Sequence, residues 1–192
     1  MVNNGYTGAA PLADYNRRQT FDIMSKALPR LKDPNDVAAR NDLCVATFLQ
    51  NRDVDDGGGN VRHWVGRVVY AFAAALFGMH GEVSQGAAHC ALTPAAIRHL
   101  GPRDPEAMCA IASALGVWKD GDPVAEASPR AADELERVFR SIGMPANLSE
   151  LNIPKSSAAV ILNASMTNFN ADPKQEFIKE KDYLGEVLAS AW

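Results

Sequence analysis

Side chains that can move protons or bind anions gather in one stretch of the chain, between Val61 and Leu100. His63, His80 and His89 carry imidazoles, whose ordinary pKa of about 6.5 suits proton transfer near neutral pH. Arg67 carries a guanidinium, which can pair with both oxygens of one carboxylate. These residue types favour acid/base chemistry on an anionic substrate, with the three histidines as candidate catalytic residues.

Each of these residues also has a plainer explanation. Arg67 lies among apolar residues and either binds an anion, reaches the surface or forms a salt bridge. His89 is either a general acid/base or a helix histidine that bonds to a neighbour, and Glu82 could orient His63 or His80. Cys90 follows His89 directly, and adjacent helix positions point in different directions, so we expect no Cys–His nucleophile pair.

Two further features could do chemistry elsewhere in the chain. Cys44, Cys90 and Cys109 are odd in number and lack CxxC spacing, so we expect thiols and no zinc site. Gly57–Gly59 resembles a phosphate-binding turn, but no Lys-Ser/Thr follows it. A flexible connection is the plainer interpretation.

Composition excludes several classes of protein. Of 192 residues, 47% are hydrophobic and 22% are charged, as in globular proteins with one core. The net charge of −4, without a basic cluster, argues against nucleic acid and anionic membranes as partners. No apolar run is long enough to span a membrane, and the first residues lack a signal segment. We therefore expect a cytoplasmic protein.

Helical periodicity and helix-ending residues recur along the whole chain, with no strand-like alternation. The expected helices cover Leu12–Leu31, Asp36–Gln50, Val61–Gly78, Gln85–Leu100, Asp104–Gly116, Asp122–Ile142, Pro154–Met166 and Tyr183–Leu188. In the second helix, Val37, Cys44, Phe48 and Leu49 are expected to face inward, and Pro94 is expected to kink or break the fourth. The sequence predicts an all-α fold, a compact bundle of seven to nine helices in a single domain over residues 1–192.

The order of these segments resembles a known protein family. The matching pieces are Ala10–Asp14, Ala27–Leu31 with Asp33–Arg40, Ala88–Leu100, Asp104–Met108, Ala114–Gly116, Leu148–Leu151 and Ala191–Trp192. Together they are similar to the C-terminal helical domain of iron-dependent alcohol dehydrogenases, in the maleylacetate reductase branch. The resemblance covers nearly the whole chain.

The resemblance implies a metal site that this chain does not complete. Members of the family have an α/β half that binds nicotinamide and a helical half that binds a divalent metal through one aspartate and three histidines. The chain begins after the segments that supply the cofactor half, the aspartate and the first histidine. The family's remaining histidines fall on Ala71, Ala75 and Gln85, of which the first and third would be metal ligands. We therefore expect no metal and no nicotinamide cofactor.

The same resemblance suggests where a substrate would bind. Residues four apart share a helix face, so Arg67, Ala71 and Ala75 form one stripe, with Trp64 one turn earlier. Gln85 and His89 share a face of the returning helix. The resemblance implies that these residues line the former active site as substrate-binding groups, with Arg67 holding an anion and Gln85 positioning the substrate.

Loss of the cofactor half would also uncover one flank of the domain. The apolar stretch Val68–Phe77 would then leave a large exposed patch, which soluble monomers rarely keep. We expect a homo-oligomer, most simply a dimer, with a separate protein partner as the competing possibility.

Three functions follow from these observations. The first is a metal-free, nicotinamide-free isomerase, lyase or hydrolase that acts on a small carbonyl- or carboxylate-bearing substrate. The second is a non-catalytic binding or accessory subunit. The third is a residual alcohol dehydrogenase or maleylacetate reductase that borrows a cofactor domain.

Overall fold

The structure, a computed structural model, describes residues 11–52, 55–56 and 63–192, and its regular structure there is entirely helical. The glycine run and Val61 lie outside the described residues. The α-helices are α1 (Pro11–Ala27), α2 (Val37–Asn51), α3 (Trp64–Met79), α4 (Gln85–Leu100), α5 (Pro105–Ala114), α6 (Ala127–Ser141), α7 (Ala158–Ser165) and α8 (Lys181–Ala189). The short 3-10 helices are η2 (Leu28–Lys32), η3 (Gly101–Arg103), η4 (Val124–Glu126), η5 (Ser149–Leu151), η6 (Lys155–Ser157) and η7 (Phe177–Glu180). The expected all-α bundle is confirmed.

Local sequence explains where most helices begin and end. Asp36, Ser84 and Asp104 precede α2, α4 and α5, and each side chain accepts a hydrogen bond from the N–H three residues later. Gly143 follows α6 with a φ of 74°, a backbone conformation that favours glycine after a helix. These contacts satisfy polar groups that a helix end leaves unpaired.

Prolines alter the helices differently from one position to another. Pro29 lies where α1 gives way to η2, so the first helix ends at Ala27 and not at Leu31. Pro94, in contrast, does not interrupt α4. The Thr93 hydroxyl donates to the His89 carbonyl at 2.6 Å in the turn where the proline lacks an N–H.

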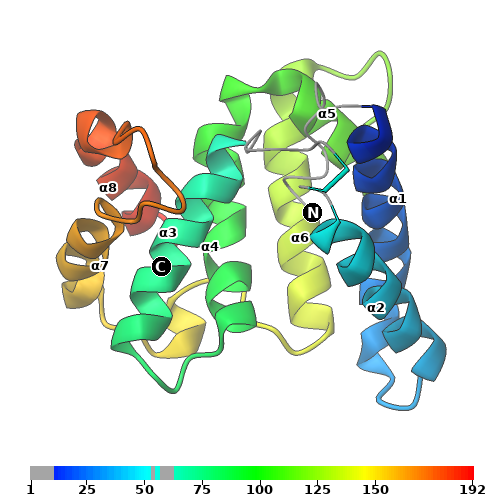
Figure 1. The fold of residues 1–192 in the computed structure, drawn as a ribbon, viewed down its shortest axis with the longest axis horizontal. Coiled ribbons are helices and arrows are strands. Elements are labelled where there is room, and N and C mark those ends of the chain that lie inside the picture. The colour runs from blue at the N-terminus through cyan, green and yellow to red at the C-terminus, as the bar shows by residue number, and fades with distance from the viewer. Residues whose placement is uncertain (1–10, 53–54, 57–62) are drawn as a thin grey trace.

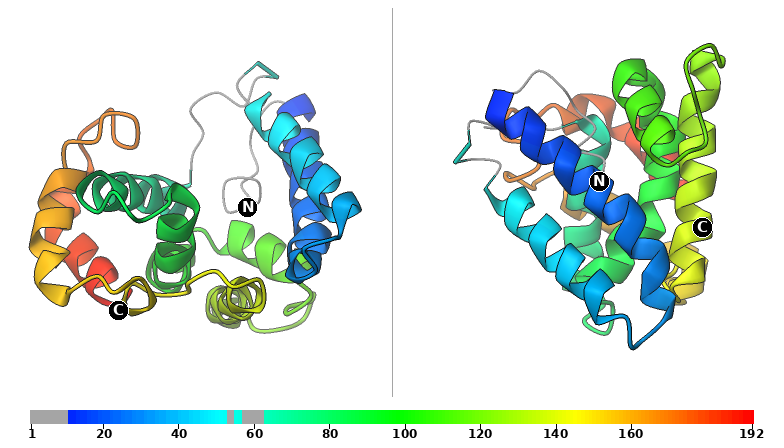
Figure 2. Two further views of the ribbon diagram at one scale, coloured as in Figure 1. Left: turned by 90° about the horizontal axis from the view of Figure 1, so that it is seen from below. Right: turned by 90° about the vertical axis from the view of Figure 1, so that its right-hand side faces the viewer.

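Helices α3 and α4 form an antiparallel pair at the centre of the molecule (Figure 1). Helix α7 packs on α3, and α8 packs on both α7 and α4. On the other side α6 packs on α4 and α5. Helices α1 and α2 lie side by side at the end far from α7 and α8, as Figure 2 also shows. None of the described helices is long and apolar enough to cross a membrane.

The core lies between α3, α4 and the helices that follow them. Its largest fully buried side chains include Phe72, Leu76, Ile97 and Leu100. Because α4 and α7 cover α3, the apolar residues of 68–77 are buried or partly buried within the chain and form no exposed patch. The reason given above for an oligomer is therefore wrong on this point.

Helix α2 contributes little to this core. Val37, Cys44 and Phe48 were expected to face inward, but all three are exposed, and only Leu49 is partly buried. The buried side chains of α2 are Ala39 and Ala46, because α2 packs against α1 through small residues. Exposed apolar side chains therefore gather on the α1–α2 pair, where Leu12 and Tyr15 of α1 are also exposed.

Candidate functional site

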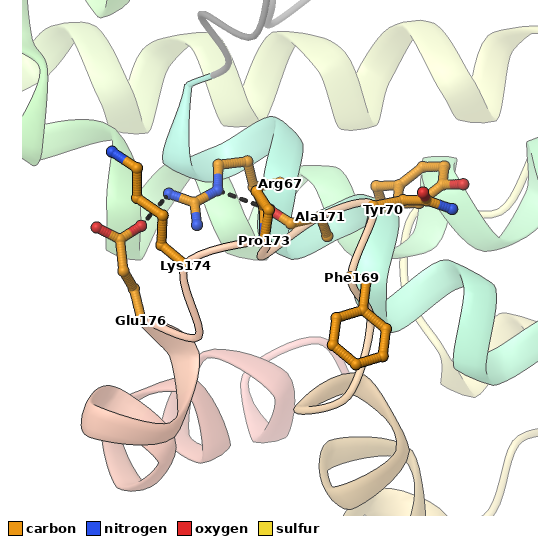
Figure 3. Close-up of a pocket in the computed structure, with 8 residues that line it drawn as sticks. Arg67, Tyr70, Phe169, Ala171, Pro173, Lys174 and Glu176 are labelled. Carbon is orange, nitrogen blue, oxygen red and sulfur yellow. Dashed lines mark hydrogen bonds and ion pairs between the residues drawn. The ribbon is translucent and has the colours of Figure 1, made fainter.

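A cleft of about 530 Å³ opens between α3 and the segment that joins α7 to η7. We call it the α3 cleft, and Figure 3 shows its lining. Its lining residues are Arg67, Tyr70, Phe169, Asn170, Ala171, Pro173, Lys174 and Glu176. Clefts of this size accommodate small molecules, and this one combines two aromatic rings with two cations and one carboxylate.

Arg67 projects from α3 to this cleft, and its three nitrogens each have a partner. Its Nε donates to the Ala171 carbonyl at 2.8 Å, and its Nη2 donates to Asp172 Oδ1 at 2.7 Å. Its Nη1 lies 2.8 Å from Oε2 of Glu176. The guanidinium is mostly buried, with 13% of the side chain exposed. Arg67 is thus a salt-bridged arginine whose partners belong to the chain itself.

Aromatic rings hold the faces of the same guanidinium. The Arg67 Cζ lies 4.9 Å from the centroid of the Trp64 ring and 5.2 Å from that of Phe177. Trp64 also packs against Arg103, whose Cζ is 5.2 Å from its ring. Trp64, a predicted substrate-binding residue, therefore acts here as a platform for two cations.

Asp172 fixes the connecting segment against Arg67. Its carboxylate is buried, and besides Arg67 it accepts backbone N–H bonds from Glu176 at 2.9 Å and Phe177 at 2.7 Å. Gln175, between them, has a φ of 54°, a left-handed conformation that non-glycine residues rarely adopt. The segment that carries half of the cleft is thus held by one buried ion pair and one tight turn.

His89 lies on α4 beside a residue of the cleft. Its Nδ1 is 2.8 Å from the carbonyl oxygen of Gln85, one turn earlier in the helix. A carbonyl only accepts hydrogen bonds, so Nδ1 carries the proton and Nε2 is the nitrogen with a free lone pair in the neutral ring. The ring centroid of His89 is 6.4 Å from that of Tyr70.

His63 occupies the N-cap of α3 and is almost completely buried. Its Nδ1 accepts a hydrogen bond from the Val65 N–H at 3.1 Å, and its Nε2 lies 3.6 Å from Oδ2 of Asp104. Burial lowers the pKa of the imidazole, and the nearby Asp104 carboxylate opposes that shift only in part. The structure gives His63 a capping role at the end of α3.

His80 and Gln85 lie at the opposite end of the α3–α4 pair. His80 is the C-cap of α3, and its Nδ1 is 3.6 Å from Oε1 of Glu82. Gln85 is the first residue of α4 and is exposed. His63 and His80 cap opposite ends of α3, so the structure does not bring the three candidate catalytic histidines together.

Ala71 and Ala75 show why the metal that the resemblance implies does not fit this chain. Ala71 is completely buried, and the Ser165 hydroxyl of α7 lies 3.3 Å from its carbonyl oxygen. Ala75 is partly buried against the core. Neither methyl group can coordinate a metal, and Gln85 offers only a neutral amide. Among the described residues, no three His, Cys, Asp or Glu side chains gather closely enough to hold an ion.

Sequence reasoning found Arg67 but missed the residues that face it. Asp172, Lys174 and Glu176 lie about a hundred positions later in the chain. The available indication was the polar stretch Asn168–Glu176 between two apolar helices, which had no assigned role. Helix periodicity could not place that stretch against α3, since it contains no regular helix.

Comparison with solved structures shows the same fold in longer enzymes. The chain superposes on a 1,3-propanediol oxidoreductase with a TM-score of 0.80 and 18% identity, over 100% of this chain and 49% of that one. It superposes on the alcohol dehydrogenase of Oenococcus oeni with a TM-score of 0.79 and 17% identity, over 96% and 46%. For the maleylacetate reductase of Rhizobium sp. strain MTP-10005 the TM-score is 0.71 and the identity 19%, over 100% and 49%. The chain thus spans less than half the length of each.

Sequence comparison assigns the family. No curated protein matches the chain as a relative. Residues 5–191, however, match the C-terminal domain of the Fe-containing alcohol dehydrogenase family. With its helical fold and the solved structures that share it, the chain belongs to the Fe-containing alcohol dehydrogenase family and corresponds to its C-terminal helical domain.

Proposed function

We propose that this chain works without a metal or nicotinamide of its own and binds a small carbonyl- or carboxylate-bearing compound in the α3 cleft. On that compound it performs acid/base chemistry of the isomerase, lyase or hydrolase type. The observation that carries the proposal is the fixed guanidinium of Arg67 in a cleft whose Tyr70 contacts His89. Polar groups held in place by the fold cost little to orient when a ligand binds.

The proposal assigns distinct roles to the residues around the cleft. Arg67 binds the anionic or carbonyl oxygen of the ligand. His89 transfers the proton through Nε2, because Gln85 holds Nδ1 as the protonated nitrogen. Trp64 positions Arg67 by packing on its face. Ala71 and Ala75 support α3 from the core side, where they supply no polar group.

Deuterium exchange tests the catalytic part without knowledge of the natural substrate. Pyruvate and oxaloacetate incubated in D₂O with the protein should exchange carbon-bound protons next to the carbonyl faster than in buffer alone. General acid–base groups contribute about 10²–10⁴-fold, so His89→Gln should slow exchange by at least about 100-fold. His99→Gln is the control, since His99 instead packs on Tyr183. Exchange at the buffer rate in the unaltered protein would remove the catalytic proposal for these compounds.

A non-catalytic accessory role is the second candidate, and two observations favour it. The three candidate histidines do not converge, and the α1–α2 pair exposes Leu12, Tyr15, Val37, Val45 and Phe48. An exposed apolar group of this kind is common at protein interfaces. Light scattering on the purified chain distinguishes the homodimer that we propose from a monomer, and co-purification tests for a different partner.

A residual oxidoreductase is the third candidate, and it comes from the relatives' names. The superposed structures include alcohol dehydrogenases, a 1,3-propanediol oxidoreductase and maleylacetate reductases. Their activity would reach this chain only if another polypeptide region supplied the nicotinamide site and most metal ligands. Calorimetric titration with NADH and with Zn²⁺ tests this directly, and binding of either by this chain would favour it over our proposal.

A further inference from the structure

We propose that Glu176 is an internal stand-in for the carboxylate of the ligand. In the resting protein its side chain occupies Nη1 of Arg67, and a carboxylate compound enters the α3 cleft by displacing it. This inference rests on the proposed function, because it concerns the same cleft. It goes further by naming the ligand class, an organic monocarboxylate, and by describing how the site is closed until that ligand arrives.

The donor capacity of Arg67 leaves room for an exchange of partners. A guanidinium has five N–H groups, and its contacts with Ala171, Asp172 and Glu176 engage one nitrogen each. Each of the two terminal nitrogens therefore keeps a further N–H. A carboxylate arriving from the cleft can bond to Nη1 without disturbing the Ala171 and Asp172 contacts.

The two carboxylates on Arg67 differ in how firmly they are held. Asp172 is 1% exposed and accepts two backbone hydrogen bonds in addition to the Arg67 bond. Glu176 is 38% exposed, and its side chain contacts only Arg67 among the described residues. Figure 3 shows its carboxylate at the edge of the cleft, next to Lys174. Asp172 is thus a permanent partner of Arg67, whereas Glu176 can swing into solvent at little cost.

Charge balance favours a negatively charged ligand over a neutral one. In the resting site the charges of Arg67 and Lys174 balance those of Asp172 and Glu176. Lys174 is exposed and makes no ion pair with any described residue, so its charge is available. When Glu176 leaves Arg67, the remaining three groups carry a net charge of +1. A monocarboxylate restores neutrality there, and an uncharged carbonyl compound does not.

The walls of the cleft indicate what the rest of the ligand is like. Tyr70 and Phe169 present aromatic rings, and the Phe169 side chain is exposed in the described structure. Figure 3 shows both on the side away from Glu176 and Lys174. An aromatic or apolar body attached to the carboxylate would cover these rings while the anion faces Arg67.

Benzoate is a suitable probe, with benzamide as its uncharged analogue. Binding is followed by NMR, through the Arg67 Nε–H signal and the signals of the connecting segment, at low ionic strength. Removing a like charge about 5 Å from the bound carboxylate, in a partly exposed site, should tighten benzoate binding by about three- to tenfold. We therefore expect Glu176→Gln to bind benzoate about three- to tenfold more tightly, and Lys174→Gln to bind it more weakly. Glu106→Gln on α5 is the matched control for the same charge change and should behave as the unaltered protein does.

The outcomes separate this inference from the proposed function. Tighter benzoate binding by Glu176→Gln, with no such gain for benzamide or for Glu106→Gln, supports it. Benzoate binding at the cleft with equal affinity in the unaltered protein and Glu176→Gln overturns the inference, while ligand binding in the cleft stands. If benzoate shifts no cleft signal even in Glu176→Gln, both the inference and the binding step of the proposed function are wrong for this ligand class.

Discussion

Replacing Ala71 with histidine restores the residue type that the family uses at a metal-ligand position, and we expect the protein to lose stability. The Ala71 side chain is completely buried in the core. Helix α7 packs on α3 here, and the Ser165 hydroxyl approaches the Ala71 carbonyl to 3.3 Å. An imidazole at this position has no solvent-filled space to enter.

The size of the loss follows from two contributions. Overfilling a packed core costs about 1–3 kcal/mol, and burying an unpaired polar group costs about 1–3 kcal/mol more. The sum is about 2–6 kcal/mol, a large share of the roughly 5–15 kcal/mol that stabilises a typical domain. For a chain of this length about 2–4 °C is lost per kcal/mol, so Tm should fall by roughly 5–20 °C.

Urea and thermal unfolding followed by circular dichroism measure this effect. Ala75→His is the matched control, because Ala75 lies one turn further on the same stripe and is only partly buried. We expect it to change the free energy of unfolding by less than about 1 kcal/mol. An Ala71→His protein as stable as the control, and further stabilised by Zn²⁺ or Fe²⁺, would show that the position still faces a metal site and would refute the reasoning.

Three further predictions concern single side chains. Because burial lowers the pKa of His63, its contribution to stability is complete above about pH 6.5 and declines as the pH falls towards the lowered value. Unfolding titrations between pH 8 and pH 5 should show this decline, and His63→Asn should lack that component; equal slopes would contradict it. Asp172→Asn breaks a buried ion pair and should cost about 3 kcal/mol in urea unfolding, against almost nothing for the exposed Asp182→Asn; similar costs for the two would count against the role of Asp172. Burial raises the pKa of Cys90 to about 11, so Ellman's reagent at pH 8 should modify the exposed Cys44 first, and faster labelling of Cys90 by mass spectrometry would be inconsistent with this.

Much of the fold could be predicted because local chemistry determines helix ends. Asp104 followed by Pro105 predicts the start of α5, and Gly143 predicts the end of α6, since both act through contacts within a few residues. The inward face of α2 could not be predicted. Val37 and Phe48 have the right spacing for a buried face, but which face is covered depends on whether another helix lies there.

The candidate site divides along the same line. Arg67 was recognisable as a possible anion-binding residue because a cation in an apolar helix needs a partner. Its actual partners, Asp172 and Glu176, come from a connection with no periodic pattern, and only tertiary packing brings them to α3. His63 was selected for its imidazole, yet its capping role depends on α3 starting at Trp64, and helix ends are less certain in sequence than helix interiors.

The loose attachment of α1 and α2 implies that the molecule opens in two steps. In the described chain, α2 gives no side chain to the main core cluster, and α1 gives only Phe21. Local opening free energies follow the apolar area that each unit buries. Native-state hydrogen exchange should therefore show the α1–α2 amides exchanging together well before those of α3 and α4. Two separate free energies of unfolding would then describe this chain, with the smaller one belonging to the hairpin.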